Sequence, residues 1–323
     1  MSAPTAEPAG STGVRWSVPL VLLVLLAAVP AVANAADMGF VTSLATRIMI
    51  YAIAAVSLDL ILGYGAMVSF GHAAFVGIGA YAVGIASAHD QWNAAVTFPV
   101  AIVAAGAFAL LTGAISLRTR GVYFIMITLA FGQMAYFTAS SLSDYGGDDG
   151  LTMWGRSELF GTTPFEDDTA FYYVVLGCLA GCFLFARAVV GSRFGRVIAG
   201  VRENRLRMQA VGFNPYVYQL VAYAIAGMMA GLAGALLANH AEFVSPSYMA
   251  WQRSGELIIM VVLGGMGTLH GAILGAIAYL TLEEVLSHWT EHWRVIFGPL
   301  LILVVLYARG GLGRLIGRSG GDG

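Results

Sequence analysis

The chain has 323 residues, of which 59% are hydrophobic and only 11% are charged, with a formal net charge of −2. A chain this apolar cannot form a water-soluble surface, whereas about 20 apolar residues suffice for one helical membrane span. The apolar runs are long and unbroken, which excludes the short alternating segments of a transmembrane β-barrel. The composition therefore predicts an all-α, polytopic helical membrane protein.

Ten apolar runs, two of them short, predict ten spans in one transmembrane domain at 17–308. Residues 1–16, rich in small and polar types, are expected to be disordered, and 309–323 form a tail. The first run also resembles a cleavable signal peptide, with Arg15 before it and Ala33-Asn34-Ala35 at its end. We expect it to be retained, because later start-transfer helices make cleavage unnecessary. The runs lie near 17–36, 41–62, 66–87, 94–116, 121–141, 170–190, 216–238, 254–268, 271–287 and 295–308.

Two glycine-rich segments, GYGAMVSFGHAAFVGIGAY at 63–81 and VVLGGMGTLHGAILGA at 261–276, interrupt the helical pattern. Unwound backbone inside a bilayer is tolerated only where protein or a water-filled cavity covers it, and discontinuous helices point dipole ends at a polar solute. We therefore expect two helix breaks that line a translocation path. The break glycines are Gly63, Gly65, Gly264, Gly265 and Gly267. Two further small-residue stripes, Ala73/Gly77/Ala80/Gly84 and Gly227/Gly231/Gly234/Ala238, are typical of helix–helix packing.

Polar side chains near the breaks are candidates for the same path, although hydrogen bonds between helices would also explain them and are the expected role of the two histidines. They are Ser69, His72, Thr268 and His270 beside the breaks and Thr128 and Gln133 on the fifth run. Ser69 and His72 do not predict catalysis, because no third group orients the histidine. Cys178 and Cys182 lie one turn apart without a nearby histidine, which favours packing over a metal site. We expect no catalytic residue and no metal ligand.

Charged side chains inside the apolar runs are few. Arg47 and Asp59 both fall within the second run, where about 18 Å of helix separates them, so they cannot pair with each other. Each lies near an end of the run, where snorkelling or pairing with a neighbouring helix is expected.

The segment 191–215 is the most cationic part of the chain, with five arginines and the single acid Glu203. The positive-inside rule places it in the cytoplasm. Val197, Ile198, Val201, Met208 and Val211 recur at helical spacing, which predicts one amphipathic helix that ends at Gly212 and Pro215, with Glu203 paired to Arg207. Such a helix can present a membrane domain to a cytoplasmic motor, and the alternative is a basic loop on anionic lipid.

Alternation outward from this loop puts both termini inside, together with eleven of the sixteen arginines. The longest polar loop, 142–169, then lies outside with seven acids, namely Asp144, Asp148, Asp149, Glu158, Glu166, Asp167 and Asp168.

Six blocks occur in order over about 50–310: GYGAMVSFGHAAFVGIGAY, GVYFIMITLAFGQM, GGDDGL, VRENRLRMQAVGFNP, AIAGMMAGLAGALLA and VVLGGMGTLHGAILGA. Together they resemble the LivM-type permeases of branched-chain amino acid ABC importers. The resemblance implies a bacterial inner-membrane subunit that works with a LivH-type permease, two ATPase subunits that hold ATP and Mg, and a periplasmic binding protein. It also implies that Asp148 and Asp149 receive the binding protein and that Arg202, Glu203, Arg207 and Gly212 contact the ATPase. The family usually has an acid and small residues where Leu206, Arg207 and Met208 stand here.

The sequence contains no lysine, so a GxxxxGK[ST] phosphate-binding loop is impossible and ATP hydrolysis must belong to another chain. No nucleic-acid partner is expected. Urea or short-chain amides are the alternative cargo. A self-sufficient channel or secondary transporter is the alternative mechanism, and it would need carboxylates deep in the spans, where only Asp59 stands.

Overall fold

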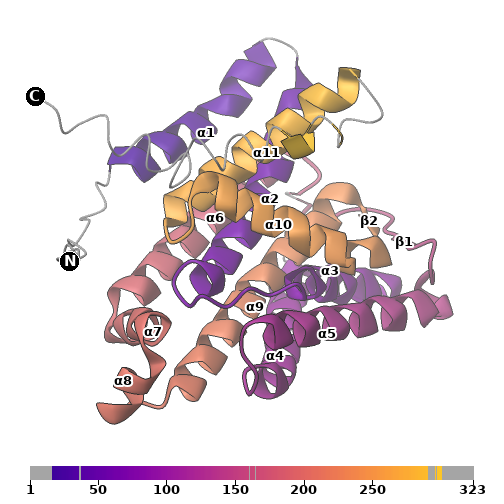
Figure 1. Ribbon diagram of the computed structural model, residues 1–323. Helices are drawn as coiled ribbons and strands as arrows, with labels where there is room; N and C mark the ends of the chain where they lie inside the picture. The colour runs from indigo at the N-terminus through magenta and orange to yellow at the C-terminus, as the bar shows by residue number, and fades with distance from the viewer. Residues whose placement is uncertain are drawn as a thin grey trace, which may run out of the picture.

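The computed structural model describes residues 17–35, 38–159, 161–163, 165–289, 295 and 297–299. It is a bundle of α-helices (Figure 1), as the composition predicts. The N-terminal segment 1–16, the tail 309–323 and most of the tenth apolar run lie outside the described residues. The helices are α1 (Ser17–Ala35), α2 (Gly39–Leu62), α3 (His72–Ala88), α4 (Ala94–Ser116), α5 (Val122–Ser141), α6 (Asp168–Gly191), α7 (Arg193–Glu203), α8 (Arg205–Ala210), α9 (Pro215–Ala241), α10 (Trp251–Gly264) and α11 (Leu269–Trp289).

Six of the described helices are long and apolar enough to cross a membrane: α2, α4, α5, α6, α9 and α11. Two shorter apolar helices correspond to the first and third runs, and α10 has only 14 residues. The number of ten spans is therefore not confirmed. The difference arises partly at the two glycine-rich segments, because α3 and α10 are short helices on one side of each break.

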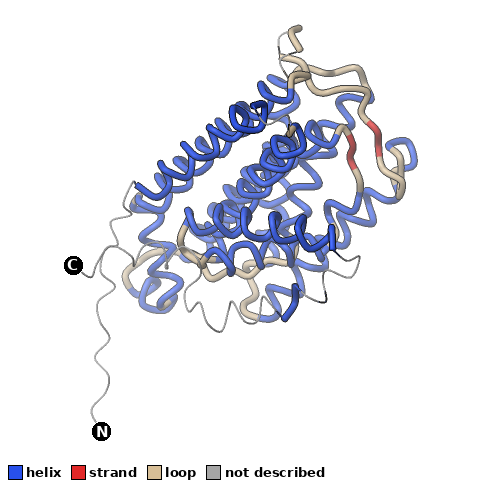
Figure 2. Tube along the Cα trace, turned by 90° about the horizontal axis from the view of Figure 1, so that it is seen from above, coloured by secondary structure: helices blue, strands red, loops and turns tan. Residues whose placement is uncertain are grey.

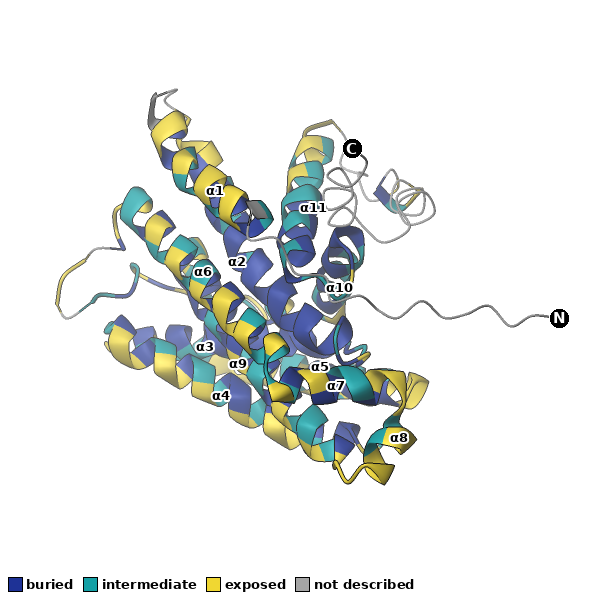
Figure 3. Ribbon diagram, turned by 90° about the vertical axis from the view of Figure 1, so that its left-hand side faces the viewer, coloured by how far each residue is buried: buried dark blue, intermediate teal, exposed yellow. Residues whose placement is uncertain are grey.

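The helices α2 and α9 form the centre of the bundle (Figure 3). In the most apolar stretch of each helix, 83% of the residues of α2 and 72% of those of α9 are buried. The corresponding share in α4, α5 and α6 is only 22–33%. The outer helices expose large apolar side chains such as Val103, Met126 and Phe137. An apolar surface this continuous suits a hydrocarbon environment, where it costs nothing.

The small residues on α9 pack against neighbouring helices at backbone contact distance. A Cβ added to Gly231 would lie 2.5 Å from the Cβ of Ala105 on α4. A Cβ on Gly234 would strike the carbonyl oxygen of Val76 on α3, and one on Gly79 would strike that of Gly231. The stripe on α9 therefore packs α3 and α4 closely, as the sequence predicts.

The 27-residue helix α9 links two opposite ends of the bundle, because it begins beside α8 and ends beside strand β2 (Figure 1). At the second end, strands β1 (Leu151–Thr152) and β2 (Phe243–Val244) lie side by side and antiparallel (Figure 2). Two short 3₁₀ turns, Ser143–Tyr145 and Pro246–Met249, complete this end. Arg156 connects the loop after β1 to the start of α6 and the end of α9, because it forms ion pairs with Asp168 at 2.7 Å and with Glu242 at 3.4 Å.

Candidate translocation and coupling site

The first glycine-rich segment is a true helix break. Helix α2 ends at Leu62, residues 63–71 are non-helical and α3 begins at His72. The segment turns back into the bundle, because His72 Nε2 lies 2.8 Å from Oγ of Ser57, five residues before the end of α2. Ser69 and His72 are completely buried.

Side chains from three other helices satisfy the polar groups of this break. The Phe70 N–H donates to Oγ1 of Thr128 on α5 at 3.2 Å, and the Ala73 N–H donates to Oγ of Ser254 on α10 at 3.0 Å. The Ser69 hydroxyl lies 3.3 Å from the Tyr223 hydroxyl on α9. Protein therefore covers the unwound backbone, which is the condition for such backbone at membrane depth.

The second break separates α10 from α11 at residues 265–268. Gly265 and Gly267 have φ values of 109° and 77°, a region that favours glycine. The Thr268 hydroxyl donates to the Gly265 carbonyl oxygen at 2.6 Å, so this side chain closes its own turn. A Cβ on Gly264 would strike the Gly271 carbonyl oxygen, which explains why the two helices can lie so close.

The two breaks meet at Asp59. Its Oδ1 accepts a hydrogen bond from the Gly267 N–H at 2.8 Å, across 208 residues of sequence. A Cβ on Gly63 would overlap both of these atoms, so only glycine fits there. Asp59 is fully buried, so of the two expected roles it does not snorkel but bonds to a neighbouring element of the bundle. Arg47 does pair with a neighbouring helix, since Nη2 lies 3.8 Å from Oε1 of Glu283 on α11.

The cationic segment contacts the first break directly. Nη1 of Arg202, in the last turn of α7, donates to the Gly63 carbonyl oxygen. Arg202, which the resemblance implies contacts the ATPase, therefore also contacts the core of the bundle: its guanidinium group joins α7 to the end of α2.

The predicted single helix over 196–212 is in fact two helices, α7 and α8, separated at Asn204. The Asn204 side chain accepts a hydrogen bond from the Arg207 N–H at 2.9 Å and so begins α8 as its N-cap. Because the helix is interrupted there, the predicted Glu203–Arg207 ion pair is absent from the described ion pairs. Val197, Ile198 and Val201 are buried as predicted, whereas Val211 is exposed.

The outer surface of this segment combines apolar and basic side chains. Leu206, Val211 and Phe213 are 72%, 68% and 37% exposed, and Arg207 is exposed beside them. Arg205 turns back to the bundle, where Nη1 donates to Gln219 Oε1 at 3.0 Å. Partial burial and the nearby Arg120 guanidinium lower the pKa of Arg205. Gly212 adopts a φ of 96° and turns the chain toward α9.

The other residues predicted for the substrate path and for binding-protein docking lie at different places in the bundle. Thr128 lies with Ser69 and His72 at the first break. Gln133 is half-buried on another face of α5, five residues and so about 140° further round the helix. His270 is half-buried in the first turn of α11, beside the second break. Asp148 and Asp149 are exposed at the end of the bundle that holds β1 and β2.

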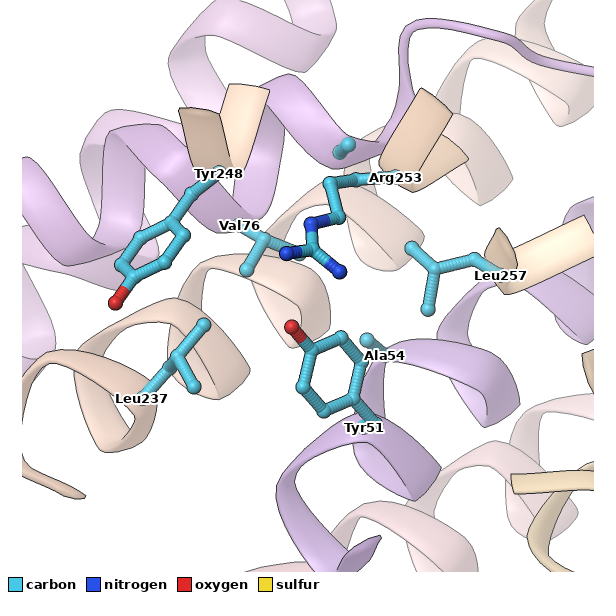
Figure 4. Close-up of a pocket in the computed structure, with 8 residues that line it drawn as sticks. Tyr51, Ala54, Val76, Leu237, Tyr248, Arg253 and Leu257 are labelled. Carbon is cyan, nitrogen blue, oxygen red and sulfur yellow. The ribbon is translucent and has the colours of Figure 1, made fainter. Parts of the chain in front are cut away.

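Sequence reasoning missed a polar cluster between α2 and α10 (Figure 4). Tyr51 and Arg253 point into a narrow cavity of about 10 Å³, room for roughly one water molecule. Arg253 Nη1 is 2.7 Å from Oε2 of Glu256. The sequence does contain a pattern that indicates this ion pair: an arginine and a glutamate lie three residues apart on an apolar helix, where charged side chains are usually paired.

The family model for the permease component of branched-chain amino acid transport systems matches residues 40–306. The chain is 28% identical to the high-affinity branched-chain amino acid permease LivM of Escherichia coli, over 83% of this chain and 69% of that protein. It is 26% identical to LivH of the same organism over 79% and 88% of the two chains. It is 28% identical to the autoinducer 2 import permease LsrC of an Enterobacter strain, over 75% and 71%. No significant match to a solved structure was found. The chain therefore belongs to the family of permease components of branched-chain amino acid transport systems.

Proposed function

We propose that this chain is one of two permease subunits of an importer that carries branched-chain amino acids across a bacterial inner membrane. Separate ATPase subunits, which hold ATP and Mg, drive the transport, and a periplasmic binding protein delivers the substrate. The observation that carries the proposal is the contact network of Asp59, Gly63, Arg202 and Gly267, which joins both helix breaks to the cationic segment. A passive pore needs no such link between a peripheral helix and its interior.

The two breaks and their polar neighbours form part of the substrate path in this proposal. Ser69, His72 and Thr128 supply hydroxyl and imidazole groups at the first break, and Thr268 and His270 lie at the second. An amino acid zwitterion needs such polar groups in an otherwise apolar passage. Breaks also direct helix ends, with their partial charges, toward the solute.

The surface formed by Leu206, Arg207, Val211 and Phe213, here called the α8 surface, docks on an ATPase subunit. Exposed apolar residues together with arginine are typical of interface centres. The segment also lies at the end of the bundle where α9 begins (Figure 1). Glu203 belongs to the same docking region.

The opposite end of the bundle faces the periplasm and receives the binding protein. Asp148 and Asp149 are exposed there, on the loop fastened by Arg156. With this sidedness, the α7–α8 segment and both termini lie in the cytoplasm. The helices α1, α3 and α10 and the run at 295–308 complete ten spans alongside the six long helices.

Co-purification tests the subunit composition. The tagged chain, expressed with its genomic neighbours and extracted in mild detergent, should retain a second, homologous permease and two copies of ATPase at fixed stoichiometry. A chain that purifies alone and still transports would be a self-sufficient channel or secondary transporter, and the proposal would fail.

A further inference from the structure

Asp59 is the one acid in the middle of the described contacts between the two breaks, and its position is not explained by helix stability. It lies in the last turn of α2, where the negative end of the helix dipole disfavours a carboxylate. Its side chain is fully buried, which is costly for a charged group. Because both its position in the helix and its burial destabilise the charged form, Asp59 must owe its presence to contacts outside α2.

The two carboxyl oxygens of Asp59 have different surroundings. Oδ1 accepts the hydrogen bond from the Gly267 N–H at 2.8 Å. Oδ2 is buried and has no hydrogen-bond partner among the residues that the structure describes. One strong acceptor therefore remains available inside the protein, at a site where leaving it unused is expensive.

The guanidinium group of Arg202 contacts the same residues as Asp59 but bonds to a different acceptor. It donates to the carbonyl oxygen of Gly63, and the Gly63 N–H donates in turn to the backbone oxygen of Asp59 at 2.8 Å. In the second break, a Cβ added to Gly267 would lie 3.7 Å from Nη1 of Arg202. The four residues are thus within one contact cluster, yet Arg202 and Asp59 form no ion pair among those described.

We propose that Asp59 is the positioning residue of the coupling step, and that Arg202 alternates between the Gly63 carbonyl oxygen and Oδ2 of Asp59. A shift of α7, driven by the ATPase, moves Arg202 from the first acceptor to the second. Because Oδ1 of the same carboxyl group holds Gly267, the movement reaches both breaks at once. The inference rests on the proposed function, since it assigns the residues through which the α8 surface acts on the substrate path.

A double-mutant cycle tests this inference in the complete importer, reconstituted in proteoliposomes with its second permease, ATPases and binding protein. Asp59→Asn keeps the shape and the Oδ1 acceptor but removes the charge, and Arg202→Gln removes the guanidinium group. The measured quantities are radiolabelled leucine uptake, with its kcat and KM, and ATP hydrolysed per leucine. Arg196→Gln is the matched control, because this arginine of α7 is exposed and donates to the nearby Gly191 carbonyl oxygen.

Each single substitution should lower kcat about tenfold and raise the ATP consumed per leucine about tenfold, while KM stays unchanged. The double variant should be no worse than either single variant, because both act on one interaction. Arg196→Gln should match wild type. Multiplicative effects in the double variant, or losses explained by lower complex yield alone, would overturn the inference while wild-type uptake still supported the function. A wild-type complex without leucine uptake would refute both.

Discussion

Single glycines decide whether the two breaks can meet. At position 63 the missing side chain leaves room for the hydrogen bond between Oδ1 of Asp59 and the Gly267 N–H. At position 265 a positive φ turns the chain between α10 and α11. By contrast, Gly177 on α6 has nothing within 4 Å of the place where a Cβ would stand. The two breaks therefore require glycine at these positions, whereas position 177 has room for a side chain.

Gly63→Ala should lower leucine uptake by about tenfold or more, because the added methyl group separates Asp59 from Gly267 and displaces the second break. Gly177→Ala is the control and should transport at the wild-type rate. Uptake by cells that express equal amounts of each variant in the membrane measures both. Equal uptake by the two variants would show that the contact between the breaks is an ordinary packing feature.

Sequence reasoning identified the glycines, the nearby polar residues and the isolated acid Asp59, but not that Asp59 joins the two breaks. Hydrophobic periodicity marks where a helix is interrupted, and that signal is local. The Asp59–Gly267 bond joins residues 208 positions apart, and no local pattern encodes which distant amide a buried carboxyl group will meet. An acid in the last turn of an apolar helix was the available clue, since such residues rarely lie inside spans without a role.

At the scale of elements, apolar length predicted the helices well and the cationic segment less well. Nine of the ten apolar runs correspond to helices α1–α6 and α9–α11. The division at Asn204 was missed because the apolar spacing continues across it, whereas asparagine is a strong N-cap and its side chain ends that continuity. As a result Val211 faces outward rather than inward, and it adds to the α8 surface.

The double substitution Leu206→Ser/Val211→Ser should reduce ATPase retention during purification about tenfold or more, because it removes apolar area from the docking surface. Val96→Ser provides the control, since Val96 is a 53% exposed apolar residue at the opposite end of the bundle. The ratio of ATPase to permease after purification is the measurement. If the ratio stays at the wild-type value while binding to anionic vesicles weakens, the α8 surface contacts lipid instead.

At the scale of the whole molecule, α9 separates a basic end from an acidic end. Helices α7 and α8 lie at one end of α9, and strand β1, which directly follows the loop with Asp148 and Asp149, lies at the other (Figure 1). The sequences of α7 and α8 contain Arg193, Arg196, Arg202, Arg205 and Arg207. Charge alone predicts this polarity from the sequence, because the positive-inside rule depends only on loop composition. The packing order of the helices could not be predicted, since all outer faces are similarly apolar.

Asp148→Asn/Asp149→Asn should slow association of the binding protein with the nanodisc-embedded complex and flatten the dependence of that rate on salt. Exposed charges mainly accelerate encounter and contribute only about 0–1 kcal/mol each to affinity, so docking should still occur. Stopped-flow association at several salt concentrations measures the effect. A rate that is independent of salt and identical in wild type and variant would show that these acids do not guide docking.

Uptake by proteoliposomes tests the central claim most directly. The complete complex, with ATP inside and leucine-loaded binding protein outside, should accumulate radiolabelled leucine against its gradient. Isoleucine and valine should compete, urea and acetamide should not, and omission of this chain, of ATP or of the binding protein should abolish accumulation. Accumulation that persists without ATP and follows an ion gradient, or uptake of urea in place of leucine, would contradict the account.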